Sequence, residues 1–220
     1  MMKEQEEMII GTDVANMIDS ELRFSSHQTY CVCVIDIVNS TRILTDMDSP
    51  LKVRKYILTF INSMAVIART FGASIVKTLG DSMIFYFPET ADSDNKAPFK
   101  RAFDCFSLML DARPLLDAKL RQEGLPPLSY RISSDYGRVE VAKSMTSKEN
   151  DLFGSTMSLC AKINSMASKN GLVIGGDLYR IVRHHNIDGS EYKFYEIGSY
   201  VTGLKFSYPV YKVTRVVKTP

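Results

Sequence analysis

Two aspartates in this sequence have surroundings that suggest a metal site. Asp36 lies within the apolar run V-I-D-I-V, where an unpaired carboxylate would be costly to bury. Asp81 directly follows Gly80 at the turn of a predicted hairpin, and Lys77 lies four residues before it. If the strand that carries Asp36 lies beside this hairpin, both carboxylates project from one edge of a sheet. Carboxylate oxygens with positions left for water and phosphate suit Mg²⁺ better than zinc.

The residues that follow Asp36 are candidates for holding a phosphate. Asn39, Ser40 and Thr41 are good N-cap residue types and are expected to start a short helix. A helix start presents backbone N–H groups that favour an anion. The residues also leave a simpler interpretation open, in which Asp81 is an ordinary turn residue and Asp36 a strand-end carboxylate paired with a lysine.

The composition is that of a soluble protein without a strong electrostatic preference. The chain has 220 residues, of which 45% are hydrophobic, and its formal net charge is +2. It can bury one substantial core, and no basic run favours nucleic acid or an anionic membrane. The N-terminus M-M-K-E-Q-E-E-M is acidic, unlike a secretory signal, and no apolar stretch has the length of a membrane span. We therefore expect a cytoplasmic protein that binds neither nucleic acid nor membrane.

The four cysteines are Cys31, Cys33, Cys105 and Cys160, and no two of them form a C-x-x-C pair. Cys31 and Cys33 are two residues apart in a predicted strand, so their side chains face the same side of it. We expect buried free thiols rather than disulfides or a zinc site.

The order of the predicted elements indicates an α/β (α+β) layered domain. Strands are predicted at 29–38, in a hairpin over 73–87, in a pair (128–136 and 139–145) that turns at Gly137-Arg138, and at 172–174, 192–197 and 208–213. Helices are predicted after residue 39, from Pro50 to Phe71, from Pro98 to Arg121 with a kink or break at Pro114, and at 153–167 and 177–185. This order predicts a ferredoxin-like βααβ-type domain over 26–220, with a mixed, mostly antiparallel sheet and helices packed on one side of it. Residues 1–25 are expected to form an N-terminal helical extension.

Four segments resemble the class III nucleotidyl cyclase family, the adenylate and guanylate cyclases. In chain order they are D-I-V-N-S-T-R-I-L (36–44), K-T-L-G-D (77–81), D-L-F-G-S-T-M-S-L-C-A-K-I (151–163) and G-L-V-I-G-G-D-L-Y (171–179). K-T-x-G-D is fairly specific, whereas the other segments carry weight mainly through their order and spacing. The resemblance implies a cyclase catalytic domain that forms a homodimer, with the active sites at the subunit interface.

The resemblance also implies a metal site and a reaction. Asp36, Asp81 and Ile37 would belong to a site for two Mg²⁺ or Mn²⁺ ions. The ribose 3′-hydroxyl of ATP would attack the α-phosphate, which gives 3′,5′-cyclic AMP and releases pyrophosphate. In such a site the pKa of the attacking hydroxyl falls, and the charge on the phosphates is offset by the metal ions. No dedicated protein base is obviously required.

The partner protomer would supply Lys77 and Asp151 to the purine, according to the same resemblance. Adenine presents an acceptor ring nitrogen beside a donor amine, which a lysine donor and an aspartate acceptor match. Guanine presents the opposite pattern, and guanylate-type members have an acidic residue at the position of Lys77. The pair therefore favours ATP. Two simpler roles stay open: a lysine that snorkels from the hairpin, and an aspartate that caps the helix predicted to begin at Phe153.

The sequence departs from the family pattern at two positions that affect rate. Active members carry an Asn and, four residues on, an Arg on the helix after D-x-x-G, where this chain has Ser158 and Lys162. Lys162 keeps the positive charge but lacks the planar fork that grips a phosphate through two bonds, and Ser158 is shorter than Asn. Because one lost donor can reduce the rate by a factor of about 10²–10³, we expect a slow enzyme. Both residues are also ordinary for a solvated helix face.

Two further positions differ from the family. Asn39 stands where many prokaryotic members have Gly, which predicts a tighter or shifted phosphate-binding turn. Lys205, a weaker candidate for a phosphate contact, lies in V-T-G-L-K-F-S-Y instead of a Lys-Gly turn. Three functions follow: an adenylate cyclase, a catalytically degenerate nucleotide-binding or regulatory homologue, and a metal-independent dimerisation module. We favour the first, because the metal pair and the purine pair are both intact.

Overall fold

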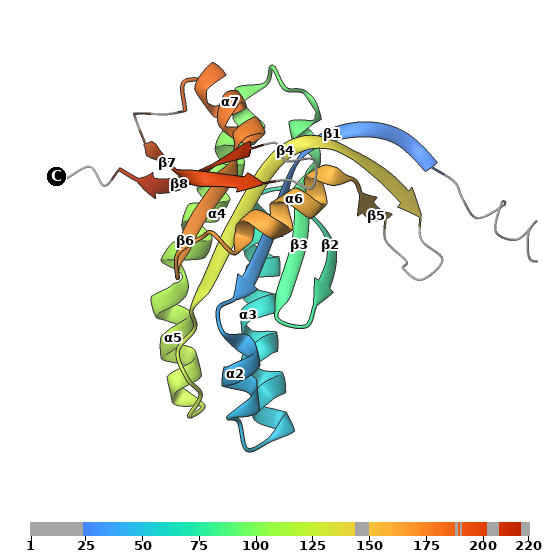
Figure 1. The fold of residues 1–220 in the computed structure, drawn as a ribbon. Helices are drawn as coiled ribbons and strands as arrows, with labels where there is room; N and C mark the ends of the chain where they lie inside the picture. The colour runs from blue at the N-terminus through green and yellow to red at the C-terminus, as the bar shows by residue number, and fades with distance from the viewer. Residues whose placement is uncertain (1–23, 144–149, 188, 190, 202–206, 217–220) are drawn as a thin grey trace, which may run out of the picture.

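The computed structural model of the protein contains one sheet, which carries the candidate site among the described residues. Its long strand β1 (Phe24–Ile37) lies between β3 (Ser82–Phe87) and β4 (Tyr130–Lys143). The structure describes residues 24–143, 150–187, 189, 191–201 and 207–216. The other strands are β2 (Ser74–Leu79), β3 (Ser82–Phe87), β4 (Tyr130–Lys143), β5 (Asn150–Phe153), β6 (Gly171–Gly175), β7 (Tyr192–Val201) and β8 (Ser207–Arg215). Their order in the eight-stranded sheet is β2-β3-β1-β4-β6-β8-β7, and β5 pairs with β4 (Figure 1). The β4–β6 pairing is parallel and the other described pairings are antiparallel, so the predicted mixed, mostly antiparallel sheet is confirmed.

Helices cover both faces of the sheet. They are α2 (Ser40–Thr45), α3 (Pro50–Thr70), the 3-10 turn η1 (Pro88–Ala91), α4 (Lys96–Asp111), α5 (Arg113–Gln122), α6 (Ser155–Asn164) and α7 (Gly176–His184). The core of one face joins Cys31, Cys33 and Ile35 of β1 to buried residues of α3, α4, α5 and α7. On the opposite face, Val32 and Val34 pack in a second cluster with residues of α6. The expectation that all helices lie on one side is therefore wrong for α6, because β1 is apolar on both faces and needs cover on both.

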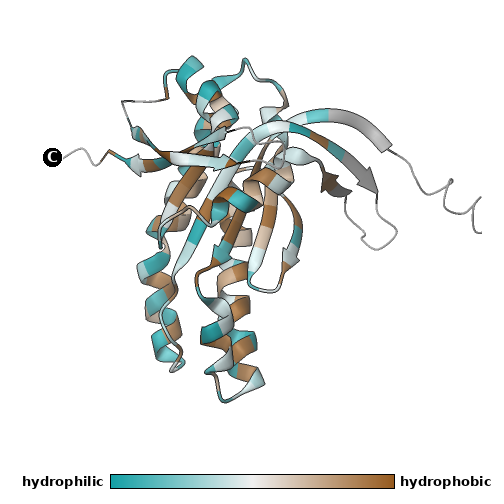
Figure 2. Cartoon of the chain, in the orientation of Figure 1, coloured by the Kyte–Doolittle hydropathy of each residue, from teal (hydrophilic) through white to brown (hydrophobic). Residues whose placement is uncertain are grey.

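Sequence signals account for the ends of α3 and for the division between α4 and α5, whereas α4 begins at Lys96 instead of Pro98 and α6 spans Ser155–Asn164 instead of 153–167. Ser49 caps α3 by accepting a hydrogen bond from the backbone N–H of Leu51, and Gly72 follows its end with φ of 82°. Pro114 divides the long helical segment as predicted, and it occupies the first turn of α5, where a missing N–H has no helical partner to lose. Figure 2 shows hydrophilic and hydrophobic residues alternating along α3 and α5, as expected for helices with one buried side.

The predicted turn at Gly137-Arg138 is wrong, because β4 runs through these residues as one strand. Gly137 pairs with Tyr30 of β1 in the middle of this strand. A Cβ atom at Gly137 would lie 2.5 Å from Oγ1 of Thr156, which is on α6. Glycine at this position therefore allows α6 to lie close against β4. In the sequence alone, a glycine with this packing role looks the same as a glycine in a turn.

Most of the predicted N-terminal extension lies outside the described residues, and β1 begins at Phe24. The four cysteines are buried, as predicted, and their thiols are free. Asn150 and Asp151, for which the sequence analysis predicts no strand, belong to β5. Across the part of the chain that the structure describes, no helix combines the length and the apolar character that a membrane span requires.

Candidate active site

The two aspartates singled out in the sequence lie at one edge of the sheet. Asp36 is opposite Ser82 in the β1–β3 register, and the backbone N–H of Ile37 donates to the carbonyl oxygen of Asp81 at 3.3 Å. Asp81 is held there by the tight turn between β2 and β3, where Gly80 has φ of 60°, a left-handed conformation that favours glycine. We call this place, with Asp36, Ile37 and Asp81, the aspartate edge.

The electrostatics of the aspartate edge favour a cation. The Asp36 side chain is 21% exposed, and burial is the largest cause that raises its pKa. The nearby negative charge of Asp81 is a smaller cause that raises the pKa of Asp36 further. A divalent cation bound by both oxygen groups would offset this repulsion, so the residues present fit Mg²⁺ or Mn²⁺. No group of three or more His, Cys, Asp and Glu side chains suited to a metal occurs among the described residues, so the protein offers these two carboxylates here.

An arginine that the sequence analysis missed binds Asp36. Arg131 of β4 lies opposite Asp36 in the strand register, and its Nε and Nη2 donate to the two carboxylate oxygens at 3.0 and 3.1 Å. This fork lowers the pKa of Asp36, which burial, the largest single cause, nevertheless keeps raised overall. The simpler interpretation of Asp36 as a carboxylate paired with a lysine therefore names the wrong partner. The sequence did contain a signal for this pair: Arg131 is a charged residue in a predicted strand, next to apolar Ile132, which is buried. A partly buried charge requires a partner of opposite charge.

The turn after β1 has the geometry that a glycine would give. Asn39 has φ of 59° and ψ of 29°, the left-handed conformation that Asn tolerates better than most residues. The difference between Asn39 and the family's Gly therefore requires no change of backbone shape, and the expected distortion of this turn is not needed. Ser40 is half-buried and Thr41 is exposed at the start of α2, which has only six residues.

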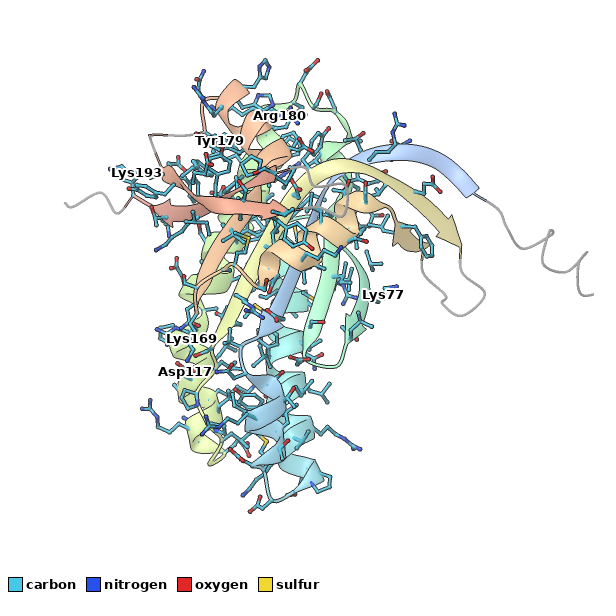
Figure 3. The ribbon with its side chains drawn as sticks, in the orientation of Figure 1. Lys77, Asp117, Lys169, Tyr179, Arg180 and Lys193 are labelled. Carbon is cyan, nitrogen blue, oxygen red and sulfur yellow. The ribbon has the colours of Figure 1, made fainter. Side chains whose placement is uncertain are left out.

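The two predicted purine contacts lie on strands that are not paired in the sheet but contact each other. Lys77 is half-buried on the edge strand β2, directly after a register shift in the β2–β3 pairing, and Figure 3 shows its side chain projecting from the outer side of β2. Asp151 pairs with Ala142 in β5, and β5 contacts β2. Asp151 does not cap a helix, because α6 begins at Ser155 and its N-cap is Gly154. Lys205 lies outside the described residues.

The two departures from the family pattern lie on the exposed side of α6. Ser158 and Lys162 are both exposed and one helical turn apart, as the predicted helix requires. The Lys162 ammonium lies 5.7 Å from the ring centroid of Tyr200 on β7. We call this place, with Ser158 and Lys162, the α6 surface.

Comparison with known proteins identifies the family to which this fold belongs. The family model described as the adenylate and guanylate cyclase catalytic domain matches residues 22–205. The chain therefore belongs to this family, and the resemblance seen in the sequence is confirmed.

The relatives include both adenylate and guanylate cyclases. An adenylate cyclase of Streptomyces griseus is 26% identical over 157 residues, which is 71% of this chain and 33% of that protein. The chain thus spans about a third of the length of this curated relative. The crystal structure of the adenylyl cyclase CyaB of P. aeruginosa has a TM-score of 0.76 at 18% identity, covering 90% of this chain and 98% of that one. A guanylyl cyclase structure has a TM-score of 0.72 at 19% identity, covering 87% of this chain and 94% of that one. Because both kinds share the fold, the fold alone does not select the base.

Proposed function

We propose that the protein is an adenylate cyclase that converts ATP to 3′,5′-cyclic AMP and pyrophosphate in a cytoplasmic homodimer. The observation that carries this proposal is the aspartate edge, where the hydrogen bond from the Ile37 N–H to the Asp81 carbonyl oxygen brings the β2–β3 turn next to Asp36 near the end of β1. A divalent cation bound by both carboxylates would offset their mutual repulsion, in addition to the charge that Arg131 supplies to Asp36. Because the chain belongs to the cyclase family, we infer that this cation arrives as a complex with a nucleoside triphosphate.

Each group of the site has a distinct task in this reaction. Asp36 and Asp81 would hold two metal ions, and these ions would lower the pKa of the ribose 3′-hydroxyl and offset the phosphate charge. The 3′-oxygen then forms a bond to the α-phosphorus while the bond from that phosphorus to the β-phosphate oxygen breaks. The hydroxyl proton passes to solvent and pyrophosphate leaves. Asn39, Ser40 and Thr41 remain candidate phosphate contacts beside Asp36.

Arg131 has a place in this mechanism because its fork and a metal ion compete for Asp36. Both oxygens of Asp36 accept hydrogen bonds from the guanidinium. A guanidinium fork matches phosphate oxygens as well as it matches a carboxylate. Arg131 would then be able to exchange part of its contact with Asp36 for phosphate oxygens of the bound nucleotide. Metal binding and phosphate binding are thereby coupled.

The α6 surface acts on the nucleotide bound by the other protomer. Ser158 and Lys162 occupy the positions of the family's Asn and Arg, and both are exposed on one side of α6, where a second subunit can reach them. Lys162 brings a positive charge toward the α-phosphate, with less geometric control than an arginine. The enzyme is therefore slow.

The choice of ATP rests on Lys77 with Asp151. A lysine donates to the ring nitrogen of adenine, and an aspartate accepts from its amine. The contact between β2 and β5 brings the two strands together on which these residues lie. A Lys77→Glu variant is expected to lose ATP turnover and to gain turnover of GTP relative to ATP.

Incubation of the purified protein with ATP and Mn²⁺ or Mg²⁺, followed by chromatography for cyclic AMP, tests the proposal. GTP in place of ATP tests the base. Asp36→Ala is expected to abolish product, whereas Asp48→Asn, at an exposed ion pair with Lys52, is the matched control and keeps the rate. Product in Asp36→Ala, or none in the parent protein, contradicts the proposal.

The Arg131–Asp36 pair favours a second candidate, a catalytically degenerate homologue that binds nucleotide and regulates another protein. In that case the arginine replaces the metal as the partner of Asp36. Ser158 and Lys162 then impair no function, because the protein carries out no turnover. Calorimetry with a non-hydrolysable ATP analogue distinguishes the candidates that make no product. Metal-dependent binding indicates the nucleotide-binding homologue, and its absence indicates a metal-independent dimerisation module.

A further inference from the structure

The Lys162 ammonium has an aromatic neighbour that the sequence pattern of the family did not lead us to expect. It lies 5.7 Å from the ring centroid of Tyr200, within the range of about 6 Å in which an ammonium is attracted to a ring face. Tyr200 is on β7 and Lys162 on α6, so the contact joins two elements that are far apart in the sequence.

The ring of Tyr200 is held in place by its surroundings. It is half-buried and packs against an apolar cluster of Ile163, Ala167, Val173 and Val210, which lies between α6 and the sheet. Tyr200 also lies opposite Tyr208 in the β7–β8 register, and the Tyr208 hydroxyl donates to buried Asp135 at 2.7 Å. The ring is therefore a fixed feature beside an exposed and flexible lysine.

The backbone of β7 brings Tyr200 to the end of α6. The β7–β8 register shifts between Glu196 and Gly198, and Gly198 has φ of 144°, which favours glycine. A Cβ atom at Gly198 would lie 3.7 Å from Cε of Met166, just after α6. The irregularity therefore lets the last residues of β7 pass close to the C-terminal end of α6, where Figure 1 shows the two elements near each other.

We propose that Tyr200 is a positioning residue that holds the Lys162 ammonium for the α-phosphate, an inference that rests on the proposed function. Arginine reaches a phosphate with a rigid planar fork, whereas lysine has a compact charge on a flexible stem and loses more freedom per hydrogen bond. A fixed ring face restricts where that charge can lie. Tyr200 thus restricts the positions of the Lys162 ammonium and partly compensates for the absence of the rigid arginine fork.

Two readouts test the inference, and one of them needs no turnover. With ¹³C-methylated lysines, the signal that disappears in Lys162→Arg identifies Lys162, and the Tyr200 ring is expected to shift it upfield. Tyr200→Leu removes this shift and Tyr200→Phe keeps it. Tyr195→Leu, which removes a 51% exposed tyrosine from the same strand, is the matched control and leaves the signal in place.

The second readout is the rate of cyclic AMP formation. Tyr200→Leu is expected to lower kcat about two- to five-fold, the size of an exposed cation–π contact, with KM for ATP nearly unchanged. Tyr200→Phe restores most of the loss, and in Lys162→Ala the change at Tyr200 has no further effect. The absence of an upfield shift overturns the inference, and so does a shift that Tyr200→Leu removes without a change in kcat. If the parent protein makes no cyclic AMP, the proposed function fails and the positioning role falls with it, while the shift still reports the contact.

Discussion

At the aspartate edge the functional side chains lie on backbone that is hydrogen-bonded to neighbouring strands, whereas on the α6 surface they project from the exposed side of a short helix. Asp36 lies between β3 and β4, and its neighbours on β1 are buried. Ser158 and Lys162 are exposed, and the described contact that orients Lys162 is a single ring. A residue in a paired strand is positioned by the sheet, but a long exposed side chain is positioned by whatever lies next to it. The aspartate edge keeps the family pattern and the α6 surface departs from it, so we expect metal binding to be less affected than turnover.

The largest effect is expected at the aspartate edge. Asp36→Asn and Asp81→Asn each remove a charge that the metal ions need, so cyclic AMP formation falls by at least about 10²–10³-fold. Ser158→Ala and Lys162→Ala lower it by about ten-fold or less, because both side chains already contribute less than the family's residues do. Initial rates of all four variants at saturating Mn²⁺ measure the difference. Equal losses at both places would remove the distinction between them.

The second prediction concerns repair of the α6 surface. Ser158→Asn combined with Lys162→Arg is expected to raise kcat about 10- to 100-fold, since it returns a longer donor and a guanidinium fork. Affinity for Mn²⁺ without nucleotide, measured by calorimetry, stays the same because the aspartate edge is untouched. A double variant that gains nothing would show that the α6 surface does not limit the rate.

The third prediction moves α6 without changing any candidate contact. Gly137→Ala places a methyl group 2.5 Å from Oγ1 of Thr156, so Thr156 must move and α6, which carries it, is expected to shift away from β4. The free energy of unfolding is expected to fall by roughly 1–3 kcal/mol, as for other overpacked sites. Turnover falls while metal affinity is kept. The matched control is Ala65→Gly on α3, which lowers the free energy of unfolding without touching α6 or β4. It is expected to leave turnover unchanged.

The smallest effect concerns Asp135, a carboxylate that is buried but belongs to neither place. Burial raises its pKa to about 6, although hydrogen bonds from Tyr208, Tyr136 and Leu178 and the charge of Arg180 lower it. Because the folded protein then binds the proton more tightly than the unfolded chain, Asp135 stabilises the fold at low pH and loses this contribution as the pH rises through 6.

Comparison with Asp135→Asn isolates this contribution. Between pH 7.5 and pH 4.5 the free energy of unfolding of the parent protein should rise by about 2 kcal/mol relative to the variant. Urea unfolding at both pH values measures it. A difference that does not depend on pH would contradict the raised pKa, and a change in metal affinity would contradict the separation of Asp135 from the aspartate edge.

The sequence by itself determined the family, most elements of the fold and the neighbourhood of the two aspartates. These features are local: apolar periodicity predicts strands and helices, and the glycine turn of K-T-L-G-D sets the hairpin that holds Asp81. Lys77 and the α6 residues were recognised for the same reason, since each belongs to a short motif.

The tertiary structure alone decided what these residues touch. Arg131 is 95 residues from Asp36 in the sequence, and only the β1–β4 register brings its fork onto the carboxylate. Gly137 has the sequence appearance of a turn, yet it is a glycine in a continuous strand because Thr156 of α6 needs its space. Tyr200 carries no motif at all and meets Lys162 only where β7 passes α6. Contacts between distant segments depend on strand order and packing, which one-dimensional periodicity does not contain.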